Sequence, residues 1–156
     1  MQSIPCAGII LMCNGSVAVV RTPAGNHSFP KGKRERGEDY FTAALRELKE
    51  ETGISADQIQ VNLELPVQDK AGVFLMKTGG TIIEISDRGN FAVFYFFATT
   101  EQQWKMQPED PTELSAACWV NITELKNLQA HSSRINFFCS VAEMLAVKDY
   151  VAPLKK

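Results

Sequence analysis

The stretch from Gly32 to Ile54, GKRERGEDYFTAALRELKEETGI, constrains the fold more than any other part of the chain. Its apolar residues recur at the spacing of a helix that buries one face: Phe41, Leu45 and Leu48. Gly53 follows as a helix stop, since glycine readily takes the left-handed conformation that ends helices. The pattern therefore predicts a helix from Asp39 to Thr52.

Acidic residues are concentrated on one side of this expected helix: Glu47, Glu50 and Glu51. At about 100° per residue, these glutamates fall within about 100° of one another, and the apolar residues fall on the other side. Ala43 and Ala44 are expected on the acidic side, where their small side chains leave room for a ligand. Arg46 can pair with Glu50 four residues on, but Glu47 and Glu51 repel each other at the same spacing. A divalent cation would relieve that repulsion.

The loop before the helix favours a phosphate ligand. Gly32 and Gly37 allow a tight backbone, and Glu38 lies just before the helix. The loop also carries cations along which a phosphate chain could lie, namely Lys31, Lys33, Arg34 and Arg36. Hard oxygen ligands beside basic side chains suit Mg²⁺ or Mn²⁺ bridging phosphate oxygens.

The rest of the chain alternates between strand and helix patterns. Asn14-Gly15 is a hairpin signal between two apolar runs. Strands are expected at residues 7–12, 17–20, 59–67, 73–76, 81–85, 91–98 and 116–120, with 91–98 as a central strand. Further helices are expected at residues 122–128 and 134–148. These elements predict one α/β domain over residues 1–156, with a mixed sheet between helices.

Bulk composition excludes few classes of protein. A chain of 156 residues, 45% hydrophobic, can bury a sizeable core. The net charge of −2 argues against a general nucleic-acid-binding role, so nucleic acid is not an expected partner. No apolar run approaches the roughly 18 residues of a membrane span, and no signal peptide is evident, so a cytoplasmic location is expected. The cysteines lack metal-binding or disulfide spacing, and reduced packing roles are expected for Cys6, Cys13, Cys118 and Cys139.

The same stretch resembles the signature of the Nudix hydrolases. Gly32, five residues, Glu38, seven residues and then Arg46-Glu47-Leu48-Lys49-Glu50-Glu51-Thr52-Gly53-Ile54 match that signature throughout. The order of strands and helices is also similar to the Nudix α/β/α sandwich over nearly the whole chain. The resemblance implies hydrolysis of a pyrophosphate linkage in a small phosphorylated substrate, with Mg²⁺ or Mn²⁺ as cofactor.

The resemblance also implies roles for single residues. Glu50 and Glu51 would be metal ligands, and Glu47 a further ligand or the general base. The backbone carbonyl near Lys31 or Gly32 would be another ligand. Arg46 would orient the glutamates in the catalytic centre. Glu38 would brace the loop or touch a second metal ion.

Three features resemble the diadenosine tetraphosphate hydrolase branch of the family. Phe29-Pro30-Lys31-Gly32 enters the signature, Tyr95 lies in a strand that ends Phe97-Ala98, and Glu113 precedes Trp119 by six residues. The resemblance implies that Glu113 acts at the metal site, as a rival to Glu47 for general base, and that Tyr95 stacks on a base. His27 stands where many relatives have tryptophan and is a further candidate for substrate contact.

Other substrates stay open at this stage. The Lys33, Arg34 and Arg36 cluster is also similar to diphosphoinositol polyphosphate phosphohydrolases. Phe29-Pro30-Lys31-Gly32-Lys33 is similar to mRNA-decapping enzymes, but the chain has no room for the extra helical domain that they use. A Nudix domain that only binds a nucleotide or a protein is another alternative, although binding alone would not need a full set of glutamates.

Overall fold

The first two strands form the hairpin that Asn14-Gly15 predicts. In the computed structural model, which describes residues 4–62, 75–76, 81–85 and 92–145, β1 spans Cys6–Cys13 and β2 spans Ser16–Arg21. The two strands pair antiparallel, and the turn residues have positive φ, 47° at Asn14 and 84° at Gly15. Positive φ at both central residues is the requirement of the tight hairpin turn that Asn-Gly favours.

The described strands form one mixed sheet in the order β3-β2-β1-β8-β7-β6, with β4 beside β1, β5 beside β8 and β9 beside β2. Its other strands are β3 (His27–Ser28), β4 (Lys31–Lys33), β5 (Gln60–Asn62), β6 (Leu75–Met76), β7 (Thr81–Ile85), β8 (Ala92–Thr99) and β9 (Ala116–Asn121). The pairing of β1 with β8 is parallel and the other pairings are antiparallel. Strand β8 is therefore central, as expected.

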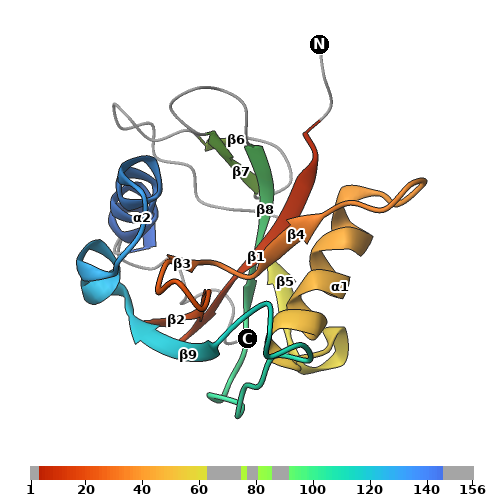
Figure 1. Cartoon of the computed structure of the whole chain (residues 1–156), viewed down its shortest axis with the longest axis horizontal. Coiled ribbons are helices and arrows are strands. Elements are labelled where there is room, and N and C mark those ends of the chain that lie inside the picture. The colour runs from red at the N-terminus through yellow and green to blue at the C-terminus, as the bar shows by residue number, and fades with distance from the viewer. Residues whose placement is uncertain (1–3, 63–74, 77–80, 86–91, 146–156) are drawn as a thin grey trace.

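A helix covers each face of the sheet, and the expected α/β/α sandwich is confirmed (Figure 1). On one face, α1 (Tyr40–Thr52) packs on β1 and β4. On the other, α2 (Ser132–Leu145) packs with the 3₁₀ helix η2 (Ile122–Asn127). A second 3₁₀ helix, η1 (Ala56–Gln58), follows α1.

Most of the expected elements are present at nearly the expected positions. The parts of the expected strands at 63–67 and 73–74, residue 91, and the expected helix beyond residue 145 lie outside the described residues. The sequence did not predict β3 and β4. These strands have two and three residues and show no apolar alternation. They join the sheet through backbone pairing, β3 with β2 and β4 with β1, and such pairing leaves no pattern in the side chains.

One prediction about α1 is wrong: its acidic side and its buried side are not opposite one another. Ala43 and Ala44 are fully buried in the core, whereas Phe41 is 37% exposed. The small alanines let the helix approach β1 closely, which turns the neighbouring Glu47 toward the sheet, where it is only 9% exposed. The glutamates therefore lie between the helix and the edge of the sheet.

Two further expectations concern the whole chain. The α-helices in the described part of the chain have 13 and 14 residues, and neither is long and apolar enough to cross a membrane. All four cysteines are free thiols. Cys6 and Cys13 are buried, as a packing role requires, and Cys139 is half-buried, but Cys118 is exposed, so the packing role expected for it is wrong.

Candidate active site

Local interactions fix both ends of α1. The Asp39 carboxylate accepts a hydrogen bond from the backbone N–H of Thr42 at 2.7 Å, which caps the N-terminus. Gly53 takes the left-handed conformation, with φ 82°, and its N–H donates to the carbonyl of Lys49 at 2.8 Å. The register of the acidic side chains on the helix follows from these two caps.

Arg46 is the centre of the hydrogen bonds that organise the glutamates. Its guanidinium makes a two-pronged contact with Glu38, with Nε–Oε2 at 2.7 Å and Nη2–Oε1 at 2.9 Å. Its Nη1 donates to Glu47 at 2.9 Å and to Glu50 at 3.1 Å. Its Nη2 also donates to the backbone carbonyl of Lys33 at 2.9 Å. One cation thus joins the loop to the helix and holds three carboxylates.

Strand β4 positions the two glutamates that face the sheet. The backbone N–H of Lys31 donates to Glu51 Oε1 at 3.0 Å. Gly32 lies directly against Glu47, because a Cβ on residue 32 would stand 2.1 Å from the Glu47 carboxylate carbon. The glycine is required here for close approach, which any side chain would prevent.

A loop from the other end of the sheet closes the site. The backbone N–H groups of Gln107 and Glu109 donate to the carbonyls of Thr52 and Glu50, at 3.0 and 2.8 Å. These carbonyls belong to the last turn of α1, where helical partners are missing. The run from Gln107 to Leu114 is thereby fastened to the helix by main-chain bonds, and Figure 1 shows this segment beside the end of α1 that precedes β5.

Helix and loop together enclose one acidic cavity of about 200 Å³. We call it the carboxylate cavity; it is lined by Glu47, Glu50, Glu51, Glu109, Asp110, Glu113 and Leu114. The structure thus brings Glu113 to the helix glutamates, as the sequence led us to expect. Sequence reasoning missed Glu109 and Asp110, although the run QPEDPTEL at residues 107–114, with three acids and two prolines, was an available signal.

Burial disfavours the charged form of two of these acids in the metal-free protein. Burial, with the charges of Glu47 and Glu113, raises the pKa of Glu51 to about 8. Burial and the nearby charge of Glu50 raise the pKa of Glu47. Glu38 differs, because hydrogen bonds from Arg46 and from the Glu35 N–H lower its pKa to about 2. The cavity therefore holds carboxylates whose charge the surrounding protein does not fully compensate.

Comparison with known proteins identifies the family. The family model for the NUDIX domain matches residues 3–141, which is most of the chain. The chain belongs to the Nudix family. The fold of this Nudix chain resembles that of an Ap4A hydrolase from C. elegans, solved as a binary complex, with a TM-score of 0.68, 18% identity, and coverage of 90% of this chain and 98% of that one.

Curated relatives of the Nudix chain carry the name RNA pyrophosphohydrolase. The protein from Novosphingobium aromaticivorans is 28% identical over 132 residues, which cover 80% of this chain and 81% of the relative. The protein from Dinoroseobacter shibae is 54% identical over 37 residues, only 24% of this chain and 23% of the relative. The names support hydrolase activity for this Nudix enzyme.

The carboxylate cavity fits the divalent cations that Nudix hydrolases generally use. Its polar side chains offer only oxygen ligands, which Mg²⁺ and Mn²⁺ prefer. The raised pKa values of Glu47 and Glu51 show that their charged forms are disfavoured without a cation, and a bound cation would stabilise those forms. Among the described residues, no three His, Cys, Asp or Glu side chains are already arranged to hold a metal ion, because Arg46 draws Glu47 and Glu50 to its guanidinium.

Glu38 was expected either to brace the loop or to touch a metal ion. Its oxygens accept from Arg46 and from the backbone N–H of Glu35, at 2.8 Å, and it does not line the carboxylate cavity. The structure therefore places Glu38 as a brace and not beside the expected ligands.

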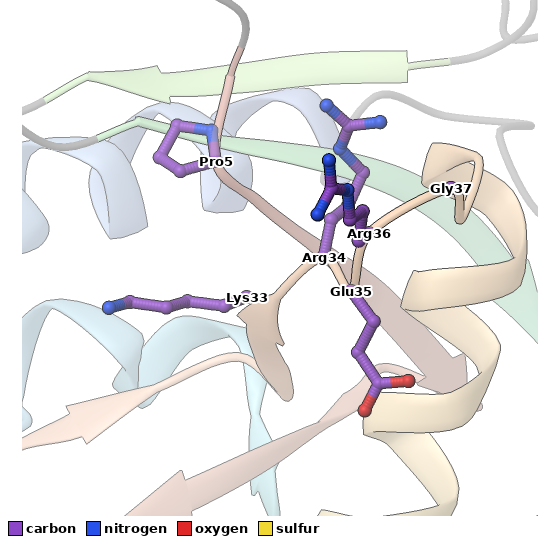
Figure 2. A pocket seen from close by; sticks show the side chains of 6 residues that line it. All are labelled: Pro5, Lys33, Arg34, Glu35, Arg36 and Gly37. Carbon is purple, nitrogen blue, oxygen red and sulfur yellow. The ribbon is translucent and has the colours of Figure 1, made fainter.

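The expected substrate-binding residues lie in four different places, and that of Tyr95 is the hydrophobic core. Lys31 reaches the site through its backbone. Lys33, Arg34 and Arg36 line a separate pocket, shown in Figure 2. His27 lines neither cavity, and its Nδ1 and backbone N–H contact the carbonyl of Gln129, at 3.0 and 2.9 Å.

Tyr95 does not occupy the position that base stacking requires. Its side chain is fully buried, its ring stacks on Phe137 with centroids 5.5 Å apart, and Phe29 packs edge-on at 5.7 Å. Its hydroxyl donates to Glu84 at 3.3 Å, and Glu84 pairs with Arg134. Tyr95 is a core residue because the continuous apolar strand β8 is covered on this face by α2, so the stacking expectation is corrected.

Proposed function

We propose that this Nudix enzyme hydrolyses a pyrophosphate linkage in the 5′-polyphosphate of a nucleotide substrate, with Mg²⁺ or Mn²⁺ as cofactor. The carboxylate cavity carries the proposal, because it joins helix acids to Glu113 from a distant loop. A cavity that only bound a polyphosphate would not need six carboxylates, since these repel phosphate in the absence of a cation.

Glu47, Glu50 and Glu51 would hold the cation, together with the carbonyl near Gly32. A bound Mg²⁺ or Mn²⁺ would neutralise charge on phosphate oxygens and make an attacking water more acidic. The protein's own contributions are positional. Arg46 holds Glu47 and Glu50 at one end of the cavity, and the Lys31 N–H orients Glu51.

Two residues are candidates for taking the proton of the attacking water. Glu113 is exposed and belongs to the loop, so its carboxylate can approach a water from outside the set of helix acids. Glu47 is buried against Gly32 and is already hydrogen-bonded to Arg46. The greater freedom of Glu113 makes it our choice for general base.

Two substrates of this class have separate support. One is a dinucleoside polyphosphate such as diadenosine tetraphosphate. It is supported by Glu113, which lines the carboxylate cavity as the resemblance implies. Tyr95 no longer supports this substrate, because its side chain is buried. The 5′-triphosphate end of RNA is supported by the names of the curated relatives and by a basic pocket at the other end of α1 from the carboxylate cavity. The enzyme in its cell is expected in the cytoplasm, where both substrates occur.

A substrate panel with Mg²⁺ tests the proposal. Diadenosine tetraphosphate, a 5′-triphosphorylated RNA, a capped RNA, a diphosphoinositol and a nucleotide sugar are compared by kcat/KM, with Glu50→Gln as the inactive control. Hydrolysis of one of the first two with kcat/KM at least tenfold above the rest supports the proposal. A preference for the diphosphoinositol, or turnover that survives in Glu50→Gln, would overturn it.

A further inference from the structure

A second pocket lies at the N-terminal end of α1, away from the carboxylate cavity. Its volume is about 330 Å³, and we call it the basic pocket; it is lined by Pro5, Lys33, Arg34, Glu35, Arg36 and Gly37. Figure 2 shows the side chains of Arg34 and Arg36 extending to the same side of the loop, whereas that of Glu35 points the opposite way and that of Lys33 points away from both arginines.

The positive charge of the basic pocket is only partly compensated by the protein, since Arg34 helps to lower the pKa of Glu38, whose carboxylate is bound to Arg46. The acid that lines it, Glu35, has its carboxylate 3.8 Å from Arg46 Nη1. Within the described residues, no carboxylate forms an ion pair with Lys33, Arg34 or Arg36. Three cations that share a pocket repel one another, and an anion would relieve the repulsion.

The guanidinium of Arg34 is held in place by its contacts with Tyr40 and Glu38. Its guanidinium carbon lies 4.2 Å from the centre of the Tyr40 ring, and that ring stacks on Phe94 at 4.9 Å. Its Nη1 donates to the carbonyl of Glu38 at 2.9 Å. Its Nε is buried and has no hydrogen-bond partner among the described residues. Because Nε is buried, phosphate oxygens would have to bind the outer nitrogens of this fixed guanidinium.

The distance between the basic pocket and the carboxylate cavity favours a phosphate of an RNA chain over one of a dinucleoside polyphosphate. Tyr40 and Glu50 are ten residues apart on α1, which is about 15 Å along the helix axis. At about 3.4 Å per phosphate, the spacing along one strand of a duplex, this span corresponds to at most about four nucleotides, and to fewer in a more extended single strand. A dinucleoside polyphosphate carries its phosphates in one short chain between its nucleosides, whereas RNA carries a phosphate at every step.

We infer that Lys33, Arg34 and Arg36 form a second anion site, which holds a backbone phosphate of a single-stranded RNA whose 5′-polyphosphate lies in the carboxylate cavity. The inference rests on the proposed function in its RNA form. It also modifies the expectation, based on net charge, that nucleic acid is not a partner.

The test measures binding without catalysis. A 5′-monophosphorylated RNA of ten nucleotides, labelled at its 3′ end, has no pyrophosphate linkage to hydrolyse, and it is titrated with the protein at a constant Mg²⁺ concentration by fluorescence anisotropy at 50 to 300 mM NaCl. The test variant is Lys33→Ala/Arg36→Ala, because both side chains are exposed. The matched control is Lys105→Ala/Lys126→Ala, which removes the same charge from exposed positions that do not line the pocket. Melting temperatures of both double variants should stay within about 2 °C of wild type.

Each phosphate contact contributes about 0.7 to the slope of log K against log salt for a single strand. Because the basic pocket is inferred to hold one backbone phosphate, the slope for Lys33→Ala/Arg36→Ala should be shallower than wild type by about 0.7, while the control keeps the wild-type slope. Equal slopes in the two double variants would overturn the inference.

A second measurement separates this inference from the proposed function. With Mg²⁺, wild-type kcat/KM is measured for triphosphorylated RNAs of one, two, four and eight nucleotides. It should rise up to about four nucleotides, and Lys33→Ala/Arg36→Ala should flatten the rise through KM. If wild type hydrolyses no triphosphorylated RNA, the RNA form of the proposed function fails, whereas the salt slopes still decide whether the basic pocket binds RNA phosphate.

Discussion

The carboxylate of Glu47 occupies the space that any side chain on residue 32 would need, since a Cβ there would lie 2.1 Å from its carboxylate carbon. Gly32→Ala should therefore displace Glu47. We expect kcat/KM to fall at least 10²-fold, because misplacement of a catalytic group by about 1 Å has that effect. Overpacking should also lower the melting temperature by a few degrees.

The matched control for this change is Gly15→Ala in the β1–β2 turn. Gly15 has φ 84° and open space around its Cβ position, so alanine there is strained but touches nothing in the site. It should lower the melting temperature and leave kcat/KM within twofold of wild type. Wild-type kcat/KM in Gly32→Ala would show that the position of Glu47 is not critical.

The two acids at the end of α1 should be needed for catalysis and not for folding. Glu50→Gln and Glu51→Gln should each lower kcat at least 10²-fold and weaken Mn²⁺ binding, measured by calorimetry. The metal-free melting temperature should hold or rise slightly, since Glu50→Gln removes a charge that acts on Glu47, and Glu51→Gln removes a carboxyl whose charged form burial disfavours. The exposed Glu143→Gln on α2 is the control. Near wild-type turnover at saturating Mg²⁺ would remove these acids from the metal site.

The roles of Glu113 and Glu47 can be distinguished by the effects of Glu113→Gln and Glu47→Gln on kcat and on Mg²⁺ affinity. Losing a general base costs about 10² to 10⁴ in rate. Glu113→Gln should cut kcat by this amount, with KM and apparent Mg²⁺ affinity nearly unchanged. Glu47→Gln should lower both kcat and Mg²⁺ affinity. If Glu113→Gln is within a few-fold of wild type and only Glu47→Gln collapses, the base is on the helix.

Glu38 should contribute stability that depends on pH in a defined direction. Its pKa in the folded protein, about 2, lies below the ordinary value of 4.5, because Arg46 and the Glu35 N–H stabilise the charged form. This contribution is present in full above pH 4.5 and is lost as pH falls toward 2. The melting temperature of Glu38→Gln should therefore fall short of wild type at pH 6 and converge with it by pH 2. A constant difference at all pH values, or one equal to that of the exposed Glu101→Gln, would contradict this role.

Tyr95 should affect stability and not substrate binding. Tyr95→Phe removes the hydroxyl that donates to buried Glu84, at a cost of about 1.5 to 3 kcal/mol. That cost corresponds to about 3 to 12 °C in melting temperature for a chain of this size. KM for diadenosine tetraphosphate and for triphosphorylated RNA should stay within twofold. A raised KM at an unchanged melting temperature would place the tyrosine against substrate.

Local chemistry made much of the fold predictable. Asn14-Gly15 and Gly53 are positions where backbone conformation selects the residue, so the hairpin and the end of α1 could be placed from sequence. The short strand β4 could not, because it joins β1 by backbone bonds that leave no pattern in its side chains.

The candidate site was predictable where its residues share one element. The helix acids and Arg46 follow from spacing along α1, whereas Ala43 shows the limit of that reasoning. A helical wheel gives the angles of side chains relative to one another, but it does not say which side of the helix faces the sheet. Because α1 approaches β1 closely, Ala43 is buried and Phe41 is partly exposed, the opposite of what we expected. Glu109 and Asp110 reach the cavity only because their loop docks on the far end of the helix.

That docking has a consequence for how the enzyme can change. Gln107 and Glu109 are attached to α1 through their backbone N–H groups, and every residue except proline supplies such a group. The position of the loop is thus independent of the side chain at 109. Substitutions there can alter the charge and shape presented to a substrate without moving the acids of the helix, so new substrate preferences are accessible by single steps that leave the catalytic framework intact.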